Sequence, residues 1–187
     1  MAERVVTTGR SQNFRGAVWR THWREIAATD WILSLRTSGR YHRGLDLFPP
    51  AKTWPALYTS LEPQVAVWEM VRRSAARNLV FLRNNVLSEL EIDLGRVLDL
   101  GDPATVGLTW ADLTSLDTRV CQEIAAAAQT HGYQGLLVPS AAMRGLNLII
   151  LPRNLSDPLP VRVVGSDELS LETLAQNRPD KSAGTVP

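Results

Sequence analysis

The stretch ALYTSLEPQVAVWEMV, residues 56–71, decides how the centre of the chain folds. Its first six residues, 56–61, read as a β-strand. Ser60 can cap a helix that follows at once, and Pro63 suits the first turn of that helix. We expect this helix to run to about residue 77. A strand that passes directly into a helix therefore places residue 69 on a helix beside the sheet.

Further elements follow on both sides of this stretch. The helix after residue 116 is the best defined, since Leu116, Val120, Ile124 and Ala127 share one face, Asp117 can cap its start and Gly132 can end it. Strands are predicted over residues 16–20, 79–83, 86–93, 97–100, 135–139, 146–151 and 161–164, the last at a sheet edge. A short helical turn is predicted over 23–28, a long loop over 36–55, a turn at 101–103 and a short helix over 110–115.

The order of these elements predicts the fold class. Strands dominate both ends with helices between them, and the pattern does not alternate as in a doubly wound sheet, so we predict an α+β fold. We expect one domain over residues 14–176, a flexible N-terminus over 1–13 and a disordered tail over 177–187.

Bulk properties exclude several function classes. The formal net charge of the 187 residues is +1, which argues against electrostatic binding of nucleic acid by this chain. Cys121 is the single cysteine, so an internal disulfide is excluded and a reducing cytoplasm fits. The first ten residues lack the apolar core of a secretory signal, and the apolar runs are too short to span a bilayer. We expect a soluble cytoplasmic protein.

Standard catalytic motifs are absent, and a few polar residues stand out instead. The sequence has no Gly-rich phosphate loop, no HExxH and no GxSxG, and the three histidines are too scattered to indicate a metal site. Glu69 is the only charge in VAVWEMV, which places a carboxylate beside an apolar patch. The alternative interpretation is a surface ion pair with Arg72 or Arg73.

Other candidate residues follow strands or lie in the long loop. Arg20 ends the strand at 16–20 and Arg40 lies in SGRYHRG; either arginine could bind phosphate or be a solvated surface residue. Tyr41 and Tyr58 could stack on a ring, although Tyr58 could equally belong to the core. Ser140 and Asn147 adjoin two apolar strands, where each could face a cleft or simply serve a turn.

Taken in order, five segments resemble the RES domain, named for its arginine, glutamate and serine. They cover about residues 16–155. The segments are GAVWR (16–20), SGRY (38–41), LYTSLEPQVAVWE (57–69), CQEIAAAAQTHGYQGLLVPSA (121–141) and GLNLIIL (145–151). The resemblance assigns these three roles to Arg20, Glu69 and Ser140, and a second arginine to Arg40. The chain departs from the family at Tyr41, where a tryptophan is usual, at Thr21, where some relatives carry tyrosine, and at Arg119, near the place of a serine in some relatives.

The resemblance implies a fold like that of ADP-ribosyltransferases, with central twisted β-sheets flanked by helices. It also implies a toxin of a type II toxin–antitoxin system that cleaves the nicotinamide–ribose bond of NAD⁺ by water or by inorganic phosphate, as an NAD⁺ glycohydrolase or phosphorylase. The expected partner is an antitoxin with an Xre-type helix-turn-helix, which blocks the NAD⁺ pocket, binds DNA and forms a hetero-oligomer with the toxin.

A mechanism fits these residues without a cofactor or a metal. Glu69 would stabilise the oxocarbenium-like ribose. Arg20 and Arg40 would hold the pyrophosphate or an incoming phosphate, and Tyr41 or Tyr58 would pack against nicotinamide. Ser140, with Asn147 nearby, would bind substrate or position the attacking oxygen. Two alternatives remain: a mono-ADP-ribosyltransferase acting on a protein, and a non-enzymatic partner-binding subunit. A ribonuclease fits the near-neutral charge less well.

Overall fold

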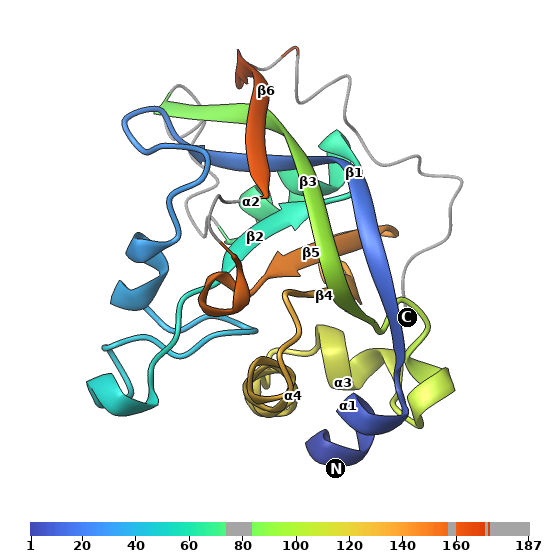
Figure 1. The fold of residues 1–187 in the computed structure, drawn as a ribbon. Helices are drawn as coiled ribbons and strands as arrows, with labels where there is room; N and C mark the ends of the chain where they lie inside the picture. Colours follow the sequence, from blue (N-terminus) through green and yellow to red (C-terminus); the bar gives the residue numbers. More distant parts are fainter. Residues whose placement is uncertain (74–83, 157–159, 171, 173–187) are drawn as a thin grey trace.

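A computed structural model describes residues 1–73, 84–156, 160–170 and 172. In this part of the chain the strands are β1 (Arg10–Trp23), β2 (Leu57–Ser60), β3 (Asn85–Asp99), β4 (Gly135–Pro139), β5 (Leu146–Ile150) and β6 (Val161–Glu168). The α-helices are α1 (Ala2–Thr8), α2 (Pro63–Arg73), α3 (Trp110–Thr114) and α4 (Arg119–Thr130). Short 3₁₀ turns are η1 (Ile32–Arg36), η2 (Pro50–Lys52), η4 (Pro103–Val106) and η5 (Pro152–Asn154). The expected α+β class is confirmed, with a central mixed sheet and flanking helices (Figure 1).

The strand pairings form a closed circuit. β1 pairs with β2, β2 with β5, β5 with β4, β4 with β3, and β3 again with β1. The β3–β4 pair is parallel and the others are antiparallel, while β1 and β2 meet only at Trp19 and Ser60. One edge of β3 carries β6 along its first half and β4 along its last three residues. The register places Ser60, the last residue of β2, opposite both Trp19 of β1 and Asn147 of β5, and it places Asn147 opposite Val138 of β4.

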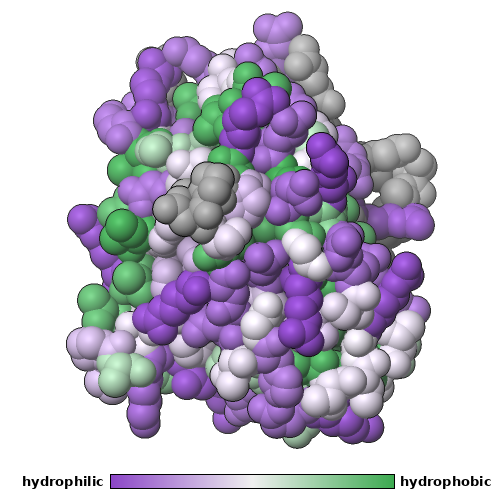
Figure 2. Space-filling view, in the orientation of Figure 1, coloured by the Kyte–Doolittle hydropathy of each residue, from purple (hydrophilic) through white to green (hydrophobic). Residues whose placement is uncertain are grey.

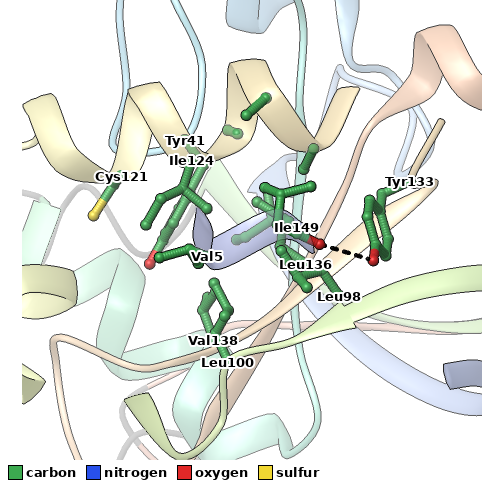
Figure 3. Packing of buried hydrophobic residues seen from close by; sticks show 14 of the residues in the cluster. Val5, Tyr41, Leu98, Leu100, Cys121, Ile124, Tyr133, Leu136, Val138 and Ile149 are labelled. Atoms are coloured by element: carbon green, nitrogen blue, oxygen red, sulfur yellow. Dashed lines mark hydrogen bonds between the residues drawn. The ribbon is translucent and has the colours of Figure 1, made fainter. Parts of the chain in front are cut away.

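Two main apolar clusters hold the sheet to the helices. One contains Ile124 of α4, Leu113 of α3 and Val5 of α1, packed against β4 and β5 (Figure 3). The other is made of strand residues such as Val18, Leu90 and Leu148. α1, α3 and α4 lie together at the lower end of the molecule in Figure 1. Burial of these apolar side chains is the main favourable term in folding.

Helix α2 has its own small cluster. Its residues Ala66, Val67 and Met70 are buried together with Leu87 of β3, and Trp19 of β1 packs against them. Their spacing puts the three side chains on one face of the helix. Glu69 therefore lies beside the buried face of α2.

Several predicted elements are confirmed, because their signals were local. The helix after residue 116, the strands over 135–139 and 146–151, and the short helix at 110–115 correspond to α4, β4, β5 and α3. Gly132 has φ +75°, a left-handed conformation that suits the end of α4. The predicted strand over 79–83, the end of the helix beyond residue 73 and the tail over 177–187 lie outside the described residues.

Other predictions differ from the structure. The predicted strands over 86–93 and 97–100 are one continuous strand, β3, and the strand predicted over 161–164 continues to Glu168. Residues 24–26 form a turn without helix, directly after β1. Gly95 and Arg96 lie opposite an irregularity in the β1–β3 register between Gln12 and Phe14. The glycine thus marked a bulge within a strand.

The N-terminus also differs from the expected flexible segment over 1–13. Residues 2–8 form α1, and Val5 and Val6 are buried in the cluster that contains α4. β1 begins at Arg10 and pairs with β3 from there. Two consecutive valines in a polar segment gave no periodic signal, and only the contact with a distant helix orders them.

None of the helices in the described part of the chain is long and apolar enough to cross a membrane. On the face shown in Figure 2 polar side chains predominate, and apolar atoms gather mainly along the left edge, where η1 and η2 lie in Figure 1. Exposed apolar side chains of this loop include Ile32, Leu45 and Leu47.

Candidate active site around Glu69

Glu69 is half-buried on α2, and one of its carboxylate oxygens accepts three hydrogen bonds. Oε1 accepts from the Ser140 hydroxyl at 2.7 Å, from the Asn147 side-chain amide at 2.8 Å and from the Ala141 backbone N–H at 3.0 Å. All three donors are neutral and come from segments more than 70 residues further along the chain. A carboxylate with several such donors is held in one place and its charge is stabilised.

The turn between β4 and β5 supplies two of these donors. Ser140 follows the last residue of β4, and its N–H donates to the Gly145 carbonyl at 2.9 Å. The Ser140 hydroxyl oxygen also accepts from Ala142 N–H at 3.0 Å. Gly145 has φ +147°, and a Cβ at this position would collide with Val65 of α2. Glycine therefore allows the turn to lie directly against α2, close to Glu69.

Ser60 and Asn147 complete the framework. The Ser60 hydroxyl donates to Asn147 Oδ1 at 2.7 Å, which directs the amide nitrogen of Asn147 toward Glu69. β2 and β5 hold the two residues directly opposite one another. The prediction that Ser60 caps α2 is therefore wrong, because its hydroxyl donates across the sheet.

Two cavities meet at Glu69. The first has a volume of about 560 Å³ and contains Arg20, while the second has about 580 Å³ and contains Arg40. Glu69, Tyr58 and Asn147 line both cavities. Each volume is within the range usual for small-molecule sites, and the two together suit an elongated ligand with two parts.

The two arginines hold different partners. Arg20 donates to the Ala28 carbonyl at 2.5 Å. Arg40 donates to three successive carbonyls at the end of α3, those of Leu113, Thr114 and Ser115, at 3.2, 3.3 and 2.6 Å. The structure brings Arg20, Arg40 and Glu69 to adjoining cavities, although 20 to 49 positions separate them in the sequence.

The two candidate tyrosines have different surroundings. Tyr41 is only 2% exposed, and its ring lies among core residues near Ile124 and Cys121 (Figure 3). Burial raises the pKa of its phenol well above the ordinary value, so it stays neutral. Tyr58 is half-buried and lines both cavities. Tyr41 lines the second cavity only, so Tyr58 is the more exposed tyrosine and the one shared by both cavities.

Ser140 is 1% exposed and lies outside the lining of both cavities. Its hydroxyl donates to Glu69 and accepts from the following turn. This placement suits a residue that positions Glu69, whereas Asn147 both positions Glu69 and lines the cavities.

Sequence reasoning missed several residues of this site. His22 lines the first cavity, and burial lowers its pKa, which favours a neutral ring at pH 7. Arg72 and Gln122 line the second cavity. His42 also lines the second cavity and is hydrogen-bonded to Tyr58. Arg72 entered the sequence analysis only as a possible ion-pair partner of Glu69, one helical turn away, and nothing local singles out the other three.

Comparisons with known proteins bear on both fold and family. The chain is similar to a chain in the crystal structure of the M. tuberculosis MbcT–MbcA toxin–antitoxin complex, with a TM-score of 0.79 and 24% identity over 95% of this chain and 96% of that chain. This likeness concerns the fold alone. No curated protein sequence matched significantly. A family model described as the RES domain matches residues 17–173, most of the chain. The resemblance drawn from the sequence is thus confirmed, and the chain belongs to the RES domain family.

Proposed function

We propose that this protein is an NAD⁺-cleaving toxin of a toxin–antitoxin system. The observation that carries the proposal is the fixed Glu69 carboxylate where two cavities meet, with Arg20 in one and Arg40 in the other. A dinucleotide has two nucleoside halves joined by a pyrophosphate, and the two cavities and two cations match that plan. Membership of the RES family and the toxin–antitoxin complex of the structural neighbour support the toxin role.

The chemistry follows from the charge at each position. When the bond between ribose C1′ and the nicotinamide nitrogen breaks, nicotinamide takes both bonding electrons and leaves as a neutral molecule. Positive charge then develops on the ribose, and the Glu69 carboxylate stabilises it. Either water or inorganic phosphate forms the new bond to C1′, and an attacking water releases its proton to the solvent. Because the leaving group is neutral, a strong general acid is unnecessary.

The other side chains would bind and orient the substrate. Arg20 and Arg40 would hold phosphate oxygens through charge-assisted hydrogen bonds. The ring of Tyr58, which lines both cavities, would pack against the nicotinamide. Ser140 and Asn147 would keep Glu69 in its productive position. We further propose that the protein acts in the cytoplasm, where an antitoxin binds it and limits access of NAD⁺ to these cavities.

Product analysis tests this proposal. Purified protein is incubated with NAD⁺, with and without inorganic phosphate, and the products are separated and identified by mass spectrometry. We expect nicotinamide together with ADP-ribose, or with ADP-ribose 1″-phosphate where phosphate is the acceptor. The reference variant is Glu69→Gln, and the matched control is Glu123→Gln, an exposed carboxylate on α4 that lines neither cavity.

Other outcomes would contradict the proposal. Intact NAD⁺ in the presence of folded protein, under all these conditions, would contradict the enzymatic function and favour a non-enzymatic subunit. ADP-ribose attached to proteins of a cell extract, without free product, would instead indicate a mono-ADP-ribosyltransferase.

A further inference from the structure

His42 is a buried histidine that lines the second cavity together with Tyr58. It is 5% exposed, and both ring nitrogens have partners. Nδ1 lies 2.9 Å from the Tyr58 hydroxyl, while Nε2 lies 2.7 Å from the Ser34 carbonyl and 2.8 Å from the Thr37 carbonyl. One imidazole therefore connects η1, the loop after it and β2.

The partners of the ring determine its protonation. A carbonyl oxygen only accepts hydrogen bonds, so Nε2, which faces two of them, must carry a proton. In the neutral ring Nδ1 then has a lone pair, and it accepts the hydroxyl proton of Tyr58. The Tyr58 oxygen in turn accepts from the Tyr41 backbone N–H at 2.9 Å. The Tyr58 hydroxyl is thereby directed away from ligand chemistry and toward His42.

Gly39 allows this arrangement to form. A Cβ at residue 39 would lie 2.6 Å from His42 Nδ1 and 2.7 Å from the Tyr58 hydroxyl, closer than van der Waals contact permits. The Gly39 carbonyl accepts from the buried Gln122 side chain at 3.0 Å, which holds the loop against α4. The loop is therefore shaped to bring His42 to the end of the Tyr58 side chain.

We propose that His42 is a positioning residue for substrate recognition, which rests on the proposed function of this site. By accepting the Tyr58 hydroxyl proton, the imidazole fixes the tyrosine ring between the two cavities. Tyr58 then recognises a planar heteroaromatic group of the substrate through its ring. Its hydroxyl serves as an anchor to the protein and transfers no proton to the substrate.

Two substitutions distinguish the contact made by Nδ1 of the imidazole from the contacts made by Nε2. In His42→Asn the amide oxygen can take the place of Nδ1 and accept from Tyr58, but the contacts to Ser34 and Thr37 are lost. In His42→Gln the amide nitrogen can reach those carbonyls, but the side chain no longer offers the acceptor that Nδ1 gave to Tyr58. Each is made in the wild-type and the Tyr58→Phe background. The matched control is His131→Gln, since His131 bonds to Glu3 at the surface and lines neither cavity.

We expect His42→Gln to raise KM for NAD⁺ about fivefold with a smaller change in kcat, because the hydrogen bonds to Glu69 remain. His42→Asn should stay closer to wild-type KM than His42→Gln, even if its unfolding temperature falls further. In the Tyr58→Phe background His42→Gln should add no further rise in KM. Equal effects of His42→Gln in both backgrounds, or a KM for His42→Asn above that for His42→Gln, would overturn the proposal.

A readout independent of catalysis separates this proposal from the proposed function. ¹⁵N NMR of histidine-labelled protein reports the tautomer, and the His42 signal is identified by its absence in His42→Gln. We expect a neutral ring with the proton on Nε2 at pH 7. A proton on Nδ1 would overturn the proposal even in a protein that cleaves NAD⁺. Conversely, the expected tautomer in a protein that leaves NAD⁺ intact would contradict the proposed function alone.

Discussion

Glu69 and Arg40 lie in the same site, yet the structure holds them in opposite ways. Side-chain and backbone donors at the ends of β4 and β5 hold the Glu69 carboxylate. The Arg40 guanidinium, in a long loop, is held by three carbonyls at the end of α3. These bonds use three of its five N–H donors. The anionic group is thus fixed by the sheet, and the cationic group by a loop and a short helix.

This difference predicts that Glu69, which the sheet holds in place, contributes more to the chemical step than Arg40 does. In Glu69→Gln the charge that we propose stabilises the ribose cation is lost while the shape is kept, so NAD⁺ turnover should fall ~10²-fold or more. Rates of NAD⁺ loss with purified wild type and variant measure the effect, with Glu123→Gln as control. Equal rates for wild type and Glu69→Gln would show that Glu69 takes no part in the chemical step, and its fixed position would then have no catalytic meaning.

Ser140→Ala tests the support for Glu69. It removes one hydrogen bond to a carboxylate without touching either cavity, so we expect kcat to fall about tenfold with little change in KM. The control is Ser11→Ala, at an exposed position in β1. A rise in KM with unchanged kcat would show that Ser140 contacts the substrate.

The two arginines give a smaller but more discriminating test. Arg20→Ala removes a cation that lines the first cavity, and it should raise KM for NAD⁺ by about tenfold. Arg40→Ala removes the donors at the end of α3 as well, so we expect a smaller rise in KM together with a fall in Tm of about 3 °C. Steady-state kinetics and thermal unfolding of both variants measure the difference. If Arg40→Ala leaves Tm unchanged, the contacts with α3 do not stabilise the fold.

Most of the fold was predictable, because its signals are local. The apolar runs at 135–139 and 146–151 and the helical spacing from Leu116 each identify an element without reference to the rest of the chain. Helix α1 and the continuity of β3 were not predictable, because each depends on contacts with a segment that is far away in the sequence. Val5 packs against α4, and β3 continues through Gly95 because β1 pairs with it on both sides of the bulge.

The site was predictable in its main residues and not in its geometry. Family resemblance pointed to Arg20, Glu69 and Ser140, and the structure brings Ser140 into contact with Glu69. The roles of Ser60 and His42 depend on partners across the sheet or loop, Asn147 and Tyr58. Local sequence signals predicted that Ser60 caps a helix. Its real partner lies on a neighbouring strand, and such partners cannot be identified before the strand order is known.

Substitution of Gly39 should give the smallest change in turnover. It tests how rigid the loop is that carries Arg40 and His42. In Gly39→Ala the added methyl group meets both His42 and Tyr58, so one of them must shift. Overpacking of this kind costs about 2 kcal/mol, which corresponds to a fall in Tm of roughly 6 °C. Gly16→Ala is the matched control, since a Cβ on that β1 residue meets nothing within 4 Å. If the loop around Gly39 can move, it will accommodate the methyl group and Tm will stay unchanged. The loop that carries Arg40 would then be adjustable, whereas the sheet and helix that hold Glu69 are fixed. A fall in Tm together with a raised KM and a nearly unchanged kcat would instead mean that both sides are fixed, and that the loop acts on substrate binding while the sheet acts on the chemical step.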